Sequence, residues 1–365
     1  MIRAVLVDDE PPARVRMRQL LEAAGGVTVV GEAGSAVEAR DVIRDTQPDL
    51  VFLDVEMPEV RGTALAASLP EPRPYIVFAT AFESYALDAI ALDATDYLLK
   101  PVSRAKLAAT LDRVRARLSK QSDLERDVAA ASNVQAQMWP GSLPHIPGFD
   151  CAAASLPARG VGGDFYDAFP IDGSTWGLLL GDASGKGMAA GLVASAVQAR
   201  VHSTATLARF APDALMAAVD RDVYATTDGA RYATAIYGSL DASTRAFTLV
   251  NAGHPPALLL DAATDAIARI NATGPALGLI EAGTFASRTV MIPKGGVLVA
   301  YTDGVSEAQN GDDEEYGDEK LAALIAGSRE LSAAALCARL LDTIRQYRGS
   351  RQDQDDVTVL VVKAL

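Results

Sequence analysis

The sequence contains little cysteine and no long apolar run. Its 365 residues include two cysteines, Cys151 and Cys337, and neither belongs to a CxxC pair or a cysteine–histidine cluster. A disulfide framework and a zinc site therefore both lack support. No run of about 18 apolar residues occurs, and the N-terminal segment MIRAVLVDDE has no apolar signal region. We expect a soluble, cytoplasmic protein.

Positive charge is also scarce. The chain has 33 Lys and Arg residues against 47 Asp and Glu residues, which gives a formal net charge of -14 at pH 7. A field of this sign repels the phosphate backbone of nucleic acids and the surface of anionic membranes. We therefore expect neither a nucleic acid nor a membrane as partner.

The chain is long enough, and at 49% hydrophobic residues apolar enough, for two or three domains. Over residues 1–117, short apolar runs alternate with helical patterns, which predicts a parallel sheet covered by helices on both faces. A helical linker follows over 118–140 and ends in the Pro- and Gly-rich WPGSLPHIPG. Over 141–365, strand-like runs separated by alanine-rich helices favour an α+β sandwich.

The helical segment carries an apolar stripe in two parts. The first part is Leu107, Leu111, Val114 and Leu118, and the second, in a shifted phase, is Leu124, Val128, Ala131 and Met138. A break of this kind locally overwinds a coiled coil. We expect the residues up to Val114 to cover their own domain and the helix beyond Leu118 to pair with a second copy, which gives a homodimer.

Polar side chains follow four successive apolar runs of the first domain. Asp8 and Asp9 follow AVLV, Asp54 follows LVFL, Thr80 ends YIVFAT and Lys100 ends DYLLK. The carboxyl ends of parallel strands share one edge of a sheet, where open α/β folds bind ligands. Three carboxylates without a thiol or imidazole suit Mg²⁺, and a lysine beside such an ion stabilises a phosphoryl group.

This stretch, together with FATAFESYALDAIALDATDYLLKP, resembles the receiver domain of bacterial response regulators, in the variant common in regulators with LytTR-type output domains. The resemblance implies a flavodoxin-like fold and phosphorylation of Asp54 by a histidine kinase. It implies Mg²⁺ held by three carboxylates and one carbonyl, those of Asp8, Asp9, Asp54 and Glu56. It also implies that Thr80 and Tyr97 act as a switch pair and that Lys100 contacts the phosphoryl group. The bond between Lys100 and Pro101 is expected to be cis. No LytTR output domain follows.

The loop LLLGDASGKG has the glycines and the lysine of a phosphate-binding loop but not its spacing. A Walker A loop needs about four residues between its first glycine and the GK pair, followed by Ser or Thr. Here Gly181 and Gly185 enclose three residues, and Gly187 follows Lys186. This spacing argues against a nucleotide-binding ATPase or kinase.

Aspartates lie next to four strand-like runs of the second half. They occur in VGGDFYD, GDASG, YTDGVSEA and QDQDDVTVLVV, as Asp164, Asp182, Asp303, Asp355 and Asp356. Two facing sheets could gather them at one edge, where so many like charges are costly unless cations fill the site. Oxygen ligands favour a pair of Mn²⁺ or Mg²⁺ ions, which activate a shared water for attack on phosphorus. The predicted chemistry is hydrolysis of a phosphate monoester.

The second half resembles the metal-dependent protein phosphatases (PPM family), in the bacterial SpoIIE/RsbU-type branch. The motifs that carry the resemblance, in the order of that branch, are QMWP, VGGDFYD, GDASGKG, NAGHPPALLL, TGPALG, YTDGVSEA and DDVTVLVV. The resemblance implies an αββα sandwich with phosphoserine or phosphothreonine phosphatase activity. It implies that Asp182 bridges two metal ions and that the Ala183 carbonyl, Asp303 and Asp355 complete their ligands. Asp164 would hold a metal-bound water or a further ion.

Other residues near these motifs have weaker support. Eukaryotic members carry Asp-Gly-His where this chain has Asp-Ala-Ser at 182–184, so the motif supplies no histidine acid. Arg159 and Lys186 are candidate phosphate-binding cations, with a surface or structural charge as the alternative. His254 could act as an acid, but a histidine between a glycine and two prolines is more typical of a fixed turn. Asp356 is a further candidate ligand.

Together the two halves predict a response regulator in which phosphorylation of Asp54 controls a Ser/Thr protein phosphatase. Kinship with the branch implies a phosphorylated anti-sigma-factor antagonist (STAS) protein as substrate, in a partner-switching pathway. The alternative is a catalytically weak adaptor that binds a partner protein under receiver control. The presence of Asp182, Asp303 and Asp355 argues against that alternative.

Overall fold

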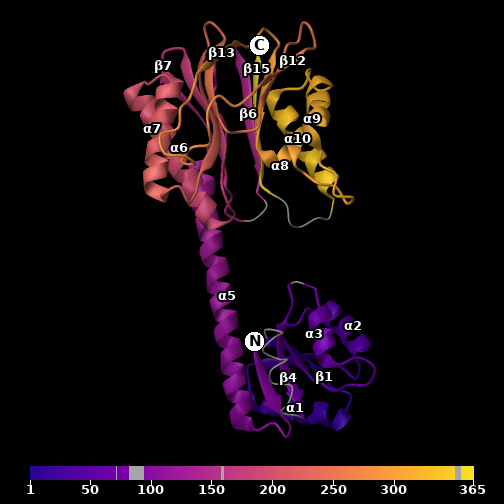
Figure 1. Cartoon of the computed structure of the whole chain (residues 1–365). Coiled ribbons are helices and arrows are strands. Elements are labelled where there is room, and N and C mark those ends of the chain that lie inside the picture. The colour runs from indigo at the N-terminus through magenta and orange to yellow at the C-terminus, as the bar shows by residue number, and fades with distance from the viewer. Residues whose placement is uncertain (71, 82–93, 158–159, 350–354) are drawn as a thin grey trace. The chain divides into compact units, whose positions relative to one another are not determined.

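The computed structural model describes residues 1–70, 72–81, 94–157, 160–349 and 355–365. The contacts within the chain divide it into two units, 1–125 and 126–365. Helix α5 (Arg104–Met138) contributes residues to both units, so the division falls inside a helix (Figure 1). None of the described helices has both the length and the apolar character that crossing a membrane requires.

The first unit is built on a five-stranded parallel sheet in the order β2-β1-β3-β4-β5. Its elements are β1 (Ile2–Val7), α1 (Pro11–Ala24), β2 (Val27–Ala33), α2 (Ala36–Thr46), β3 (Leu50–Leu53), α3 (Gly62–Ser68), β4 (Tyr75–Thr80) and β5 (Asp96–Leu99). Side chains of β1 alternate between two buried faces: Val5 and Val7 pack with α2 and α3, whereas Ala4 and Leu6 pack with α1 and α5. Helices on both faces confirm the predicted doubly wound, flavodoxin-like fold.

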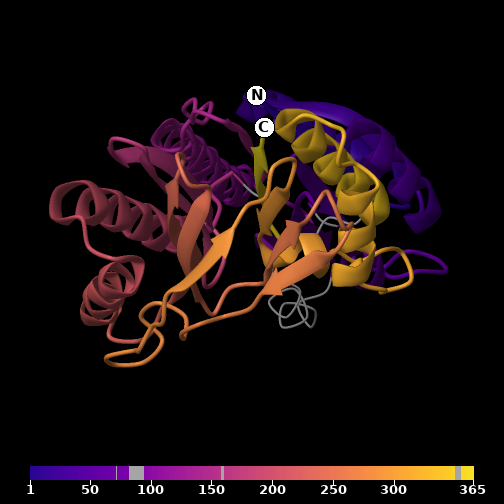
Figure 2. The same ribbon diagram turned by 90° about the horizontal axis from the view of Figure 1, so that it is seen from above.

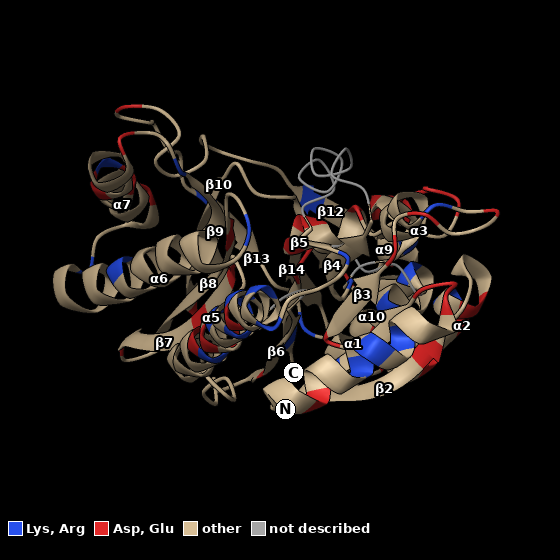
Figure 3. Ribbon diagram, turned by 90° about the horizontal axis from the view of Figure 1, so that it is seen from below, with Lys and Arg blue, Asp and Glu red and all other residues tan. Residues whose placement is uncertain are grey.

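Helix α5 begins as a core helix of the first unit and then becomes more exposed. Leu107, Leu111 and Val114 are buried against the sheet, which confirms the prediction for this part of the stripe. Further along, Leu124 is 59% exposed and Met138 is 39% exposed. Figure 3 shows residues of both charge signs along α5 and a group of basic residues on α1. The second half of α5 therefore presents apolar side chains among charged ones, and its pairing with a second copy stays a prediction.

The second unit is a four-layered sandwich of two antiparallel sheets between two helical layers. One sheet has the order β13-β10-β9-β8-β7 and the other β12-β11-β14-β15-β6. The strands are β6 (Phe149–Leu156), β7 (Asp164–Asp172), β8 (Thr175–Ala183), β9 (Ala233–Asp241), β10 (Ala246–Ala252), β11 (Ala257–Leu260), β12 (Ile267–Ile270), β13 (Arg288–Met291), β14 (Val297–Tyr301) and β15 (Val357–Ala364). The helices are α6 (Met188–Ala208), α7 (Pro212–Thr227), α8 (Asp303–Ser306), α9 (Gly317–Ala326) and α10 (Ala333–Arg348).

Three hydrophobic cores hold these layers together. One lies between the sheets, one between the first sheet and α6 and α7, and one between the second sheet and α9 and α10 (Figure 2). Strand β8 shows why its sequence is continuously apolar: Leu178 and Leu180 enter the core between the sheets, while Leu179 enters the core under the helices. The arrangement confirms the predicted αββα sandwich.

Candidate functional site

Three carboxylates meet at the carboxyl edge of the parallel sheet. Strands β1 and β3 are neighbours, with Val7 paired to Leu53, so the residues that follow them come together. Asp8, Asp9 and Asp54 each place one oxygen so that all three lie within 4.8 Å of one another. A set of oxygen ligands of this kind fits a hard divalent cation such as Mg²⁺.

Lys100 joins this cluster from the end of β5. Its Nζ lies 2.6 Å from Oδ2 of Asp8 and 2.6 Å from Oδ2 of Asp54. Burial raises the pKa of Asp54 and the charge of Asp8 adds to the effect, although Lys100 opposes both. Burial alone would lower the pKa of Lys100, but the two carboxylates raise it. One ammonium group thus pairs with two carboxylates. The predicted cis Lys100–Pro101 bond is present.

The other predicted receiver residues lie around Asp54. The Glu56 backbone N–H donates to Oδ1 of Asp54 at 3.3 Å. Thr80, at the end of β4, is fully buried, and its Oγ1 has no hydrogen-bond partner in the described part of the chain. Tyr97 lies on β5, paired with Phe78 of β4. A buried hydroxyl without a partner is costly, and a phosphoryl oxygen on Asp54 is a partner of the right chemistry.

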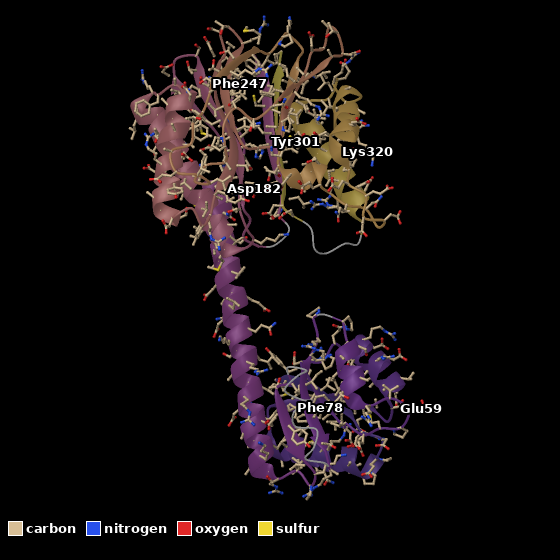
Figure 4. The ribbon with its side chains drawn as sticks, viewed as in Figure 1. Glu59, Phe78, Asp182, Phe247, Tyr301 and Lys320 are labelled. Atoms are coloured by element: carbon tan, nitrogen blue, oxygen red, sulfur yellow. The ribbon has the colours of Figure 1, made fainter. Side chains whose placement is uncertain are left out.

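In the second unit, aspartates from both sheets approach one another at one end of the sandwich. Asp164 on β7 is the cross-strand partner of Asp182 on β8. Thr302, between β14 and α8, donates from Oγ1 to Oδ2 of Asp164 at 2.8 Å and so ties the second sheet to the first. The Gly163 N–H donates to Oδ2 of Asp356 at 2.9 Å. Figure 4 shows Asp182 at the end of the sheets near α5, with Phe247 toward the opposite end.

Asp303 and Asp355 complete this group from neighbouring loops of the second sheet. Asp303 begins α8, with Thr302 between it and β14, and Asp355 lies just before β15, the strand paired with β14. Lys186 Nζ lies 3.6 Å from Oδ1 of Asp355, with both side chains largely exposed. The sequence prediction that separate aspartate motifs share one edge therefore agrees with the geometry.

Glycines allow the backbone to approach these carboxylates. A Cβ added at Gly163 would lie 2.7 Å from the Ala183 carbonyl oxygen and 2.7 Å from Oδ1 of Asp182. One at Gly162 would collide with the Asp356 carboxylate, and one at Gly304 with the Asp356 carbonyl oxygen. Side chains at these positions would fill the space in which the Ala183 carbonyl and the carboxylates face one another.

The aspartates of the second unit repel one another strongly in the absence of cations. Burial raises the pKa of Asp182 to about 9, and the charges of the neighbouring aspartates add to the effect. Burial likewise raises the pKa of Asp164 to about 7, against hydrogen bonds from Thr358 and Thr302. The pKa of Asp303 is also raised, by burial and by Asp355. Carboxylates held this way are stabilised in their ionised form by divalent cations.

The donor set fits a pair of hard cations. It consists of carboxylate oxygens and the Ala183 carbonyl, which suit Mg²⁺ or Mn²⁺. Within the described residues, the receiver carboxylates form the single group of three whose oxygens all lie within 4.8 Å. Among the described residues, the aspartates of the second unit form no such group of three.

His254 has a structural environment. It is buried, its Nδ1 pairs with Thr234 Oγ1 at 2.7 Å, and its Nε2 pairs with the Tyr301 carbonyl oxygen at 3.0 Å. Because a carbonyl only accepts, Nε2 donates and Nδ1 accepts from Thr234. Burial lowers the pKa of His254 to about 3. Both ring nitrogens are engaged within the fold, as expected for the histidine of a fixed turn. Arg159, the other candidate cation, lies outside the described residues.

Arg348 lies beside the aspartates and was missed in the sequence. It ends α10, is 9% exposed, and donates from Nη2 to the Gly304 carbonyl oxygen at 2.8 Å. Burial lowers the pKa of Arg348, while Asp355 and Asp356 act in the opposite direction. The only signal in the sequence is an arginine a few residues before the acidic stretch QDQDD, which does not by itself place the side chain.

Comparison with known proteins assigns both units. Residues 4–112 match the family model of the response regulator receiver domain, and residues 172–365 match the model described as Stage II sporulation protein E (SpoIIE). The class is therefore a receiver domain combined with a PPM-type phosphatase domain. The chain belongs to the SpoIIE family, whose model covers more than half of its length.

Curated relatives match the receiver half. The transcriptional regulatory protein BtsR of Escherichia coli (strain K12) is 46% identical over 122 residues, which cover 33% of this chain and 51% of BtsR. An uncharacterized response regulatory protein of Yersinia pestis is 43% identical over 148 residues, which cover 40% of this chain and 58% of that protein. The chain thus spans about half the length of the curated relatives it matches.

Solved structures match the phosphatase half. The RsbU and RsbW domains of Rv1364c from Mycobacterium tuberculosis share 30% identity at a TM-score of 0.54, covering 62% of this chain and 63% of that one. The SiaA-PP2C domain of Pseudomonas aeruginosa has a TM-score of 0.59 at 18% identity, covering 67% of this chain and 98% of that one. At that identity the second match shows the fold alone.

Proposed function

We propose that this chain is a two-component response regulator whose output is a metal-dependent phosphoserine or phosphothreonine protein phosphatase. In this proposal residues 1–117 form the receiver, 118–140 the helical linker and 141–365 the phosphatase. The observation that carries the proposal is the meeting of Asp164, Asp182, Asp303 and Asp355 from both sheets, with glycines opening the space between them.

The residues of the second unit would divide the work of hydrolysis. Two divalent cations, when bound, would supply a water of lowered pKa and would neutralise charge on the phosphoryl group. Asp182 from the first sheet and Asp303 and Asp355 from the second would hold the ions, and the Ala183 carbonyl would add a neutral ligand. Asp164, held by Thr302, would orient a water, with Asp356 fixing the Gly163 backbone nearby.

The receiver would supply the control. Asp54 would accept a phosphoryl group from a histidine kinase and would hold Mg²⁺ together with Asp8, Asp9 and the Glu56 carbonyl. Lys100 would contact the phosphoryl oxygens. Thr80 and Tyr97 form the switch pair. The substrate proposed is a phosphorylated STAS-type protein, and the second half of α5, with Leu124 exposed, pairs two copies into a homodimer.

A Mn²⁺-dependent hydrolysis assay tests the proposal, using p-nitrophenyl phosphate and a phosphoserine STAS protein, with and without acetyl phosphate. We expect activity in the wild type, none in Asp182→Asn, and undiminished activity in Asp172→Asn, whose side chain is exposed on β7. Activity that survives Asp182→Asn would refute the metal-site assignment. Equal activity of Asp54→Ala and wild type under phosphorylating conditions would refute receiver control.

A further inference from the structure

One side chain of helix α5 is bonded directly to the backbone beside the aspartate site. Gln135 is 8% exposed, whereas Val134 directly before it and Gln137 two residues after it are exposed. Its Nε2 donates to the Gly162 carbonyl oxygen at 2.8 Å, and its Oε1 accepts from the Gly162 N–H at 3.1 Å. One side chain thus satisfies both backbone groups of a single residue.

The chemistry of this contact suits a carboxamide. A backbone N–H and C=O of the same residue need an acceptor and a donor, and the planar carboxamide of Gln or Asn provides both side by side. Because the Asn side chain is shorter by one methylene group, the helix backbone would have to lie closer to Gly162 for Asn to make both hydrogen bonds. A carboxylate would lack the donor, and an apolar side chain would leave two buried backbone groups unpaired.

Gly162 is in turn packed against the aspartates. A Cβ at Gly162 would collide with the Asp356 carboxylate, and the next residue, Gly163, donates to that same carboxylate at 2.9 Å. Gly163 also accepts through its carbonyl from the Ala183 N–H at 3.1 Å. Displacement of Gly162 would therefore move Asp356, the Ala183 carbonyl and Asp164 at the start of β7.

Helix α6 limits the ways in which this contact can relax. A Cβ at Gly191 of α6 would lie 3.0 Å from Gln135 Nε2 and would collide with the Val161 side chain. The space around the Gln135 carboxamide is therefore filled on the side of α6 as well as on the side of Gly162.

We infer that Gln135 is a positioning residue for the aspartate site: by holding the Gly162 backbone it makes the placement of the second half of α5 a determinant of divalent-cation affinity. The inference rests on the proposed function for the role of the ions, but not for the contact itself. Gln135 touches no aspartate, so it acts through Gly162 and Gly163.

The experiment measures Mn²⁺ binding to the full chain from the electron paramagnetic resonance signal of free Mn²⁺. All proteins carry Asp9→Asn, which weakens the receiver site so that it contributes little. Gln135→Met preserves side-chain length and removes both hydrogen bonds, and Gln137→Met makes the same change at an exposed position of the same helix. Gln135→Ala repeats the test if Gln135→Met does not fold.

The expected result is an increase of about tenfold in the half-saturating Mn²⁺ concentration for Gln135→Met, the size seen when outer partners of metal ligands are removed. Gln137→Met should bind as its parent does. In the hydrolysis assay, excess Mn²⁺ should restore kcat of Gln135→Met, with KM for the phosphate ester unchanged. A folded Gln135→Met protein that binds Mn²⁺ as its parent does overturns the inference.

The two proposals fail in different ways. A chain that binds Mn²⁺ at the aspartates, loses affinity in Gln135→Met and hydrolyses no phosphoprotein would support the positioning role and contradict the phosphatase. A chain that hydrolyses phosphoserine with the same Mn²⁺ requirement in wild type and Gln135→Met would support the phosphatase and contradict the positioning role.

Discussion

Asp164 and Asp182 face each other as a cross-strand pair between β7 and β8, although like charges at such positions destabilise a sheet. Both are buried enough to have a raised pKa. The fold therefore holds a destabilising pair at the edge where Asp303 and Asp355 also arrive. This pattern is typical of a site whose charge is neutralised by bound cations rather than by the protein itself.

The first prediction concerns the stability of the metal-free protein against pH. Because the pKa of Asp182 is raised in the folded state, that state binds more protons than the unfolded chain between about pH 4 and pH 9. The contribution of Asp182 to the free energy of unfolding is therefore largest at low pH and declines as the pH rises through this range. Asp182→Asn removes this part of the pH dependence, while the raised pKa values of Asp164 and Asp303 leave a smaller decline. At pH 8 the free energy of unfolding of the metal-free variant should exceed that of the wild type by at least about 1 kcal/mol, the equivalent of one pKa unit.

The two tryptophans make this measurement specific. Trp139 and Trp176 both belong to the second unit, so urea unfolding followed by tryptophan fluorescence reports that unit without the receiver. Asp172→Asn, an exposed position on β7, is the matched control and should keep the pH dependence of the wild type. A wild type whose metal-free stability rises steadily from pH 5 to 8, in parallel with Asp182→Asn, would contradict the prediction.

The second prediction concerns Gly163. A methyl group there would lie 2.7 Å from both the Ala183 carbonyl oxygen and Asp182 Oδ1, so Gly163→Ala must displace proposed ligands. We expect Mn²⁺-dependent hydrolysis to fall by a factor on the order of 10² or more, since small displacements of catalytic groups have effects of this size. Gly141→Ala, which adds a methyl group in open space, should have full activity. Retained activity in Gly163→Ala would contradict the assignment of Asp182 and the Ala183 carbonyl as metal ligands.

The third prediction concerns Lys100. Lys100→Met removes the ammonium that lies 2.6 Å from Asp54 but leaves the three carboxylates. Mg²⁺ affinity should be equal or higher, because a competing cation is gone. Phosphorylation by acetyl phosphate, measured as the mass increase of the intact protein, should slow by a factor on the order of 10². Lys106→Met on the exposed face of α5 should react like the wild type.

The position of the aspartates could be predicted from the sequence because strand ends are local features. Each aspartate follows or precedes an apolar run, and antiparallel or parallel pairing then brings run ends together. Asp8 and Asp54, and likewise Asp164 and Asp182, required no knowledge of distant packing beyond the neighbouring strand. The strand-like runs predicted only an α+β sandwich, and the αββα arrangement was implied by the resemblance to the PPM phosphatases.

The contacts of Gln135 and Arg348 could not be predicted in this way. Both side chains reach the site from helices, and their contacts depend on how α5 packs against residues 160–163 and how α10 packs against α8. The apolar stripe of α5 also gave no indication of a buried glutamine, since hydrophobic periodicity does not detect a polar residue that satisfies backbone groups. Tertiary packing therefore determines the contacts of both side chains.

The last prediction distinguishes a structural from a chemical role for His254. His254→Leu leaves Thr234 Oγ1 and the Tyr301 carbonyl without their partner, at a cost of about 1–3 kcal/mol for each unsatisfied group. The free energy of unfolding from tryptophan fluorescence should fall accordingly, while kcat of the folded fraction stays the same. Since the pKa of His254 is lowered to about 3, the wild type should also lose stability as the pH falls below about 6.5, and the variant should lose less. A large loss of kcat with an unchanged unfolding midpoint would instead make His254 the proton donor to the leaving group.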